Sequence, residues 1–116
     1  MEVTTTLGPV TVLSVSGDID AATFPGLVKE TDEALNTGHV RLVLDLGGVD
    51  FVSSGGLIAL QTIAGRATSH DGKMVLCCVG SRVADVLGMT GFDRVLDIFP
   101  DVASAKASFD TGQGDP

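Results

Sequence analysis

Two adjacent serines, Ser53 and Ser54, stand where a buried apolar segment gives way to a helical pattern that begins near Gly55. Backbone N–H groups in the first turn of a helix lack intrahelical acceptors, and the helix dipole favours negative charge there. A serine at this junction is a good acceptor for a phosphate, which adds roughly −1.5 to −2 charges. The junction therefore predicts a site at which modification changes the surface charge and leaves the fold intact.

The same residues allow other interpretations. A serine can simply cap the helix while the following glycines form a tight turn. The run Ser-Ser-Gly-Gly could also bind a nucleotide phosphate, although it lacks the Gly-Lys-Ser/Thr ending of a P-loop and the Gly-x-Gly-x-x-Gly spacing of a dinucleotide site. On the residues alone, all three interpretations remain open.

Catalysis is not predicted. A nucleophilic serine needs a base and an orienting acid, and the surrounding Val-Ser-Ser-Gly-Gly is not the Gly-x-Ser-x-Gly elbow. Both histidines, His39 and His70, fall in expected loops without Cys or acidic residues at metal spacing. We therefore expect a protein that is not an enzyme, with no catalytic residue, no metal site and no cofactor.

Composition restricts the partners. The chain has 116 residues, of which 44% are hydrophobic, enough for one domain with one core. A net charge of −8 argues against direct binding to nucleic acid or to anionic membranes and favours a basic protein partner or a cationic ligand. No apolar run approaches the roughly 20 residues of a membrane span.

The adjacent Cys77 and Cys78 lie in an apolar strand, where they should point to opposite faces, stay unpaired and belong mostly to the core. A reducing cytoplasm fits this usage.

Hydrophobic periodicity and turn residues predict the elements that position the serines. The expected strands span residues 2–7, 10–16, 40–46, 74–79 and 95–99. The expected helices span residues 21–36, 55 to about 71, 81 to about 88–91 and 101–109. Gly8 and Pro9 should close a hairpin between the first two strands, and Asp20 should cap the first helix. The fold class is therefore α/β, a mixed sheet with an opening hairpin and about four helices packed on it. Residues 1–109 form one domain, and residues 110–116 a flexible tail.

Four pieces of the chain together resemble the STAS domain, in particular the bacterial anti-sigma factor antagonists. They are Gly-Asp-Ile-Asp at residues 17–20, Leu-Val-Leu-Asp-Leu at 42–46, Val-Asp-Phe-Val-Ser-Ser-Gly-Gly-Leu at 49–57 and Gly-Phe-Asp-Arg-Val-Leu at 91–96. The resemblance covers residues 3–109, and the order of elements agrees with it.

The resemblance implies roles for particular residues. Matching Gly56 and Leu57 to the family's Gly-Leu places Ser54 at the position that a partner kinase phosphorylates. Ser53 stands where the family usually has Asp and becomes a rival acceptor, and Gly55 replaces a second hydroxyl residue. The residues implied in partner binding are Asp20, Ser53, Ser54, Gly55, Gly56 and Leu57.

The implied function is partner switching. The unphosphorylated protein would bind an anti-sigma factor that is also a serine kinase and so release a sigma factor, and phosphorylation would reverse this. Such a protein would be a cytoplasmic monomer or weak dimer. Because Ser53 replaces the Asp, a second hypothesis is a constitutive STAS interaction module, such as a scaffold or a transporter-complex subunit. A third is a small nucleotide- or phosphate-binding domain that uses the same glycines.

Overall fold

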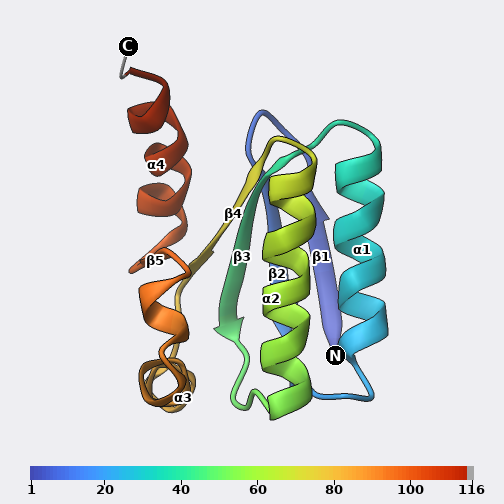
Figure 1. Cartoon of the computed structure of the whole chain (residues 1–116), viewed down its shortest axis with the longest axis vertical. Coiled ribbons are helices and arrows are strands. Elements are labelled where there is room, and N and C mark those ends of the chain that lie inside the picture. The colour runs from blue at the N-terminus through green and yellow to red at the C-terminus, as the bar shows by residue number, and fades with distance from the viewer. Residues whose placement is uncertain (115–116) are drawn as a thin grey trace.

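A five-stranded sheet carries four helices in the computed structural model, which describes the backbone of residues 1–114 and the side chains of residues 1–110 (Figure 1). The strands are β1 (Glu2–Thr6), β2 (Thr11–Ser16), β3 (Arg41–Gly48), β4 (Lys73–Cys77) and β5 (Ile98–Phe99). The helices are α1 (Phe24–Asn36), α2 (Ser54–Ser69), α3 (Ser81–Thr90) and α4 (Val102–Gly114), with a 3₁₀ turn, η1, at Phe92–Arg94. None of these helices is long and apolar enough to cross a membrane.

The strands follow one another across the sheet in the order β1-β2-β3-β4-β5. β1 and β2 form the expected antiparallel hairpin, and β2, β3, β4 and β5 run parallel. Each parallel connection contains a helix, as crossovers between parallel strands require. The predicted α/β fold with a mixed sheet and four helices is confirmed.

The sheet is covered unequally on its two faces. Helices α1 and α2 lie side by side over one face and form the larger core with it (Figure 1). Helix α4 packs on the other face, where Ala105 and Phe109 contact Val43, Val75 and Cys77. Because β3 is paired on both sides and covered on both faces, its apolar residues are fully buried, as expected from residues 40–46, which are apolar except for Arg41 and Asp45. On β2 the outward residues Ser14 and Ser16 are exposed, which gives the alternation typical of a half-covered strand.

Three elements begin or end at clearly different residues from those predicted. Helix α1 starts at Phe24, with Thr23 as its N-cap, because Asp20 and Thr23 first form a separate hydrogen-bonded turn. The last strand shrinks to Ile98–Phe99, because the residues before it form η1 and leave Val95 77% exposed. Helix α4 continues through residues 110–114, where a tail is expected from the sequence. Residues 115–116 of that tail lie outside the described part of the chain.

The prediction that Cys77 and Cys78 point to opposite faces is wrong. Strand β4 ends at Cys77, and Cys78 has a left-handed backbone with φ of 63°. This turn brings the two sulfurs within 3.3 Å of each other on the same side of the sheet. Both thiols are free, with Cys77 buried as expected and Cys78 partly exposed.

Candidate functional site

The loops after β2 and β3 meet at the end of the sheet where helices α1 and α2 begin (Figure 1). Beyond the strands proper, Ile19 pairs in parallel with Val52. The Ile19 N–H donates to the Phe51 carbonyl at 3.0 Å, and the Ser53 N–H donates to the Ile19 carbonyl at 2.9 Å. These bonds bring the predicted site residues around Asp20 and Ser53 together, although they are far apart in the sequence.

Ser53 is the N-cap of α2. Its backbone is extended (φ −81°, ψ 176°), and its Oγ accepts a hydrogen bond from the Gly56 N–H at 3.1 Å. Asp and Ser are comparably good N-caps. Ser53, at the position where the resemblance leads us to expect Asp, therefore provides an equivalent capping interaction, and its hydroxyl is occupied by it.

Ser54 is the first residue of α2, and its side chain is exposed. Within residues 1–110, no group forms a hydrogen bond with its hydroxyl, and the backbone N–H groups of Ser54 and Gly55 also have no acceptor. These two N–H groups belong to the helix end where anions are stabilised. The geometry thus leaves one hydroxyl open to modification beside two donors that suit a phosphate.

The two glycines allow a close approach between the loops. A Cβ on Gly56 would lie 2.2 Å from the Ile19 carbonyl oxygen, far inside van der Waals contact. A Cβ on Gly55 would lie 3.1–3.2 Å from the backbone and Cβ of Ala21, which is tight. Gly55 thus stands in place of the family's second hydroxyl residue at a position with little room for a side chain.

Asp20 stabilises the turn that precedes α1 and is not the cap of the helix itself. Its Oδ1 accepts from the N–H groups of Ala22 and Thr23, each at 3.0 Å, and its own N–H donates to the Thr23 hydroxyl at 2.9 Å. Asp20 lies between Ile19 and Ala21, the two residues that contact the α2 N-terminus. Its carboxylate therefore serves local structure next to the serines.

The surface around Ser54 combines apolar and acidic side chains. Phe51 is 51% exposed, and Ile58, four residues after Ser54 on the same face of α2, is 55% exposed. Leu57 is only 9% exposed and packs in the core, so the exposed apolar neighbour in α2 is Ile58. The exposed positions of Phe51 and Ile58 beside Ser54 are not predicted from the sequence. The exposure of Ile58 could have been predicted from the sequence, because Ile58 does not lie on the apolar helical face formed by residues 57, 60, 63, 64 and 67.

Acidic residues complete this surface, because Asp18 and Asp50 are exposed on the two loops beside Asp20. Within the described chain, the salt bridges found, Arg66 with Asp32 and Lys73 with Asp97, lie elsewhere. The carboxylates are thus available for basic groups of another molecule.

Comparison with known proteins gives a consistent result. The model of the STAS domain matches residues 2–105. BtrV of Bordetella bronchiseptica, a candidate anti-sigma factor antagonist, is 32% identical over 97 residues, which cover 84% of this chain and 81% of BtrV. The crystal structure of an anti-sigma factor antagonist from Mycobacterium paratuberculosis is 27% identical and has a TM-score of 0.79, covering 92% of this chain and 93% of that one.

The fold is also that of SpoIIAA from Bacillus, at 11% identity. Its unphosphorylated form superposes with a TM-score of 0.70 over 97% of this chain and 99% of SpoIIAA, and its phosphorylated form with 0.69 over 92% and 99%. The matched family model spans most of the chain, and the fold agrees with that of the solved relatives. The chain therefore belongs to the STAS domain family, among relatives named as anti-sigma factor antagonists.

Proposed function

We propose that this protein is an anti-sigma factor antagonist that binds an anti-sigma factor with kinase activity through the surface around Ser54, and that phosphorylation of Ser54 dissociates the complex. The protein itself is a binding partner and a kinase substrate, not an enzyme. The single observation that carries this proposal is the contrast between the serines. Ser54 is exposed with an unbonded hydroxyl, whereas the Ser53 hydroxyl caps α2.

The surroundings of Ser54 support a role in an interface. Phe51 and Ile58 provide exposed apolar area beside it, and the carboxylates of Asp18, Asp20 and Asp50 suit a basic partner. BtrV and the Mycobacterium paratuberculosis protein are named for antagonism of anti-sigma factors, and SpoIIAA has been solved in a phosphorylated form. These observations favour a protein partner over a nucleotide.

A phosphate on Ser54 would act on affinity and leave the fold unchanged. The exposed N–H groups of Ser54 and Gly55 and the helix dipole stabilise an anion at this end of α2 by about 0.3–1 kcal/mol. In a closed interface the same charge loses its water, which costs several kcal/mol unless a cation pairs with it. Because each 1.4 kcal/mol changes affinity about tenfold, the modification is sufficient to release the partner.

The test begins with the kinase that co-purifies with the protein from its own cells. Incubation with ATP followed by mass spectrometry should find the phosphate on Ser54 in the wild-type protein and in Ser53→Ala, and none in Ser54→Ala. Ser54→Asp should fold normally and bind the partner at least about tenfold more weakly. Ser69→Asp places the same charge at the exposed far end of α2 and should bind as the wild type does.

Two outcomes would contradict the proposal in different ways. Phosphate on Ser53 alone would place the switch one residue earlier. No phosphate on either serine, together with wild-type affinity of Ser54→Asp, would leave the constitutive interaction module in its place. Perturbation of the Ser54 and Gly55 amide resonances by nucleotides would favour the phosphate-ligand hypothesis.

Asp20 provides a second test of the same surface. Asp20→Asn keeps the acceptor oxygen for the Ala22 and Thr23 N–H groups and removes the charge. We expect unchanged stability and weaker partner binding, measured by calorimetry. Equal binding would show that Asp20 serves the turn alone.

A further inference from the structure

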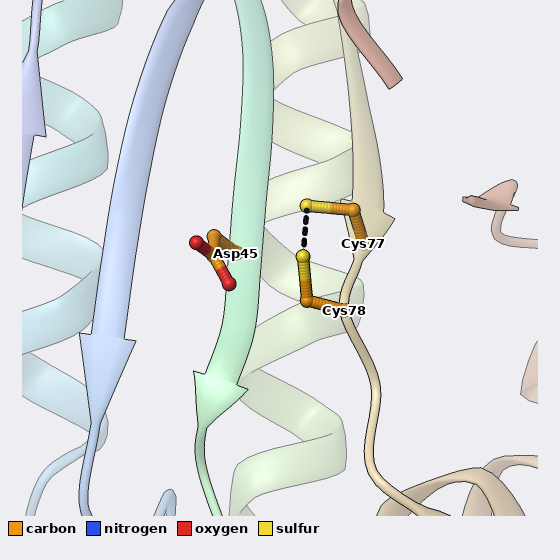
Figure 2. A group of neighbouring side chains, drawn as sticks. All are labelled: Asp45, Cys77 and Cys78. Atoms are coloured by element: carbon orange, nitrogen blue, oxygen red, sulfur yellow. Dashed lines mark hydrogen bonds between the residues drawn. The ribbon is translucent and has the colours of Figure 1, made fainter. Parts of the chain in front are cut away.

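A second group of reactive side chains lies away from the serines, on the face of the sheet that α4 covers in part. Asp45 of β3 and Cys77 of β4 are direct neighbours in the parallel register, so their side chains leave the sheet on the same face. Figure 2 shows both sulfurs, of Cys77 and Cys78, turned toward β3, where Asp45 lies. The Sγ atoms and a carboxylate oxygen all lie within 4.8 Å of one another.

The backbone of Cys78 creates this cluster. An extended residue at that position would send its side chain to the opposite face of the sheet. The left-handed conformation of Cys78 instead places its Sγ 3.3 Å from that of Cys77. Left-handed backbone in a residue other than glycine is uncommon and costs about 1 kcal/mol or more. The chain thus holds two thiols together at a cost in conformational energy.

The spacing of the three groups fits a small thiophilic cation. Two thiolates bound to one zinc ion at about 2.3 Å each lie about 3.8 Å apart at the tetrahedral angle. The observed sulfur separation of 3.3 Å needs to open by only about half an ångström to reach that value. A carboxylate as third ligand favours Zn²⁺ over Cu(I), which prefers sulfur alone.

The surroundings attract a cation and orient the carboxylate. The Gly47 N–H donates to Asp45 Oδ1 at 2.9 Å, which fixes the carboxylate as partners outside the first coordination shell do in metal sites. Burial raises the pKa of both thiols, and the carboxylates of Asp45 and Asp101 add to the rise, because the local potential is negative. A negative potential disfavours a free thiolate, and for the same reason it favours binding of a divalent cation.

Solvent reaches the cluster from the uncovered half of the sheet. An open hollow of about 330 Å³ on this face is lined by Ser14, Asp45 and Gly47, among others. Ser14 is the neighbour of Asp45 on β2 and is exposed, so Asp45 stands between the hollow and the buried Cys77. An ion therefore has an entry path, and one coordination position can remain open to water.

We propose that Asp45, Cys77 and Cys78 bind one Zn²⁺ ion at the carboxyl ends of β3 and β4, with the fourth position facing the hollow. Binding forms two Zn–S bonds and one Zn–O bond and releases the two thiol protons to solvent. The three protein ligands carry three negative charges, so the occupied site keeps a net charge of −1. This site is separate from the surface around Ser54 and does not depend on the function proposed for it.

Cadmium is the probe for the test, because its thiolate bonds have a charge-transfer absorbance in the ultraviolet. The full chain, reduced with a phosphine and freed of metal with a chelator, should develop this absorbance and saturate at one equivalent of Cd²⁺. Zn²⁺ should compete it away, and either ion should raise the melting temperature. Cys78→Ser should lose about half of the absorbance per bound ion and bind at least about tenfold more weakly.

Asp45→Asn keeps both thiols and should weaken binding about tenfold or more with the absorbance at saturation unchanged. Asp85→Asn, at an exposed residue of α3, is the matched control and should bind as the wild type does. Circular dichroism of each variant checks that it folds. Absence of the absorbance at stoichiometric Cd²⁺ would overturn the proposal. So would equal affinity of the wild type, Cys78→Ser and Asp45→Asn, which would show that the ion binds outside this cluster.

Discussion

Replacing each serine by alanine should separate the capping hydroxyl from the free one by stability alone, without any partner. In Ser53→Ala the Gly56 N–H loses its acceptor, and Gly56 is buried, so water replaces the lost bond poorly. Loss of an N-cap costs about 0.5–2 kcal/mol, and a buried unsatisfied donor costs about 1–3 kcal/mol. These two figures describe the same lost bond and do not add. We therefore expect a loss of about 1–2 kcal/mol in the free energy of unfolding.

Ser54→Ala should behave differently. The Ser54 hydroxyl has no hydrogen-bond partner among the described residues, and alanine is the better helix former by up to about 0.5 kcal/mol. The net change should stay within about 0.5 kcal/mol of zero. Ser53→Asp, which restores a good cap and the family's usual residue, should likewise stay close to the wild type.

Urea unfolding followed by circular dichroism measures all three variants. With a slope of about 2 kcal/mol per molar urea, Ser53→Ala should lower the midpoint by roughly 0.5–1 M, and the other two should shift it by less than about 0.3 M. Equal destabilisation by Ser53→Ala and Ser54→Ala would refute the assignment of the cap. Such a result would also mean that Ser54 is not the one serine of the two whose hydroxyl is free for modification.

Three further measurements test other parts of the fold. The Thr11 hydroxyl is fully buried and has no partner among the described residues, so Thr11→Val should raise the free energy of unfolding by about 1 kcal/mol in urea titrations, and a loss would show that the hydroxyl is bonded. Gly56→Ala would drive a Cβ into the Ile19 carbonyl and should cost about 2 kcal/mol or more, measured in the same way; a neutral result would mean that the loops separate freely. In the metal-free native protein at pH 7, both thiols are protonated because their pKa values are raised, and Cys77 is also buried. Maleimide should therefore label Cys78 slowly and Cys77 more slowly still, and raising the pH should speed the labelling. Labelling rates equal to those of the unfolded chain would contradict the burial of the thiols.

The sequence predicts the order of elements because most strands carry a clear signal. β3 is apolar from Leu42 to Leu46 except for Asp45 and is followed by turn residues, and α2 has apolar residues at helical spacing, so both are recognisable. The last strand fails because Val95 and Leu96 look like strand residues, while the turn η1 leaves Val95 exposed. Local apolarity does not distinguish a strand from a hydrogen-bonded turn at the same place.

The sequence locates the site at the junction between β3 and α2 but does not distinguish the roles of the two serines there. Periodicity locates the start of α2 within a few residues, whereas the roles of Ser53 and Ser54 depend on a shift of one. The cluster of Asp45 with the two cysteines is harder still. It requires the register of β3 against β4 and the left-handed backbone of Cys78, and neither is encoded in the spacing of the three residues.

Strand β1 forms an open edge of the sheet, and this has a consequence for handling the protein. Its outer backbone groups face away from β2, and the segment Glu-Val-Thr-Thr-Thr carries one charge and no proline, lysine or bulge to discourage strand addition. Mutual repulsion at a net charge of −8 opposes strand addition between copies. Because 1 M salt shortens the screening length to about 3 Å, light scattering should detect self-association in concentrated salt before any loss of structure.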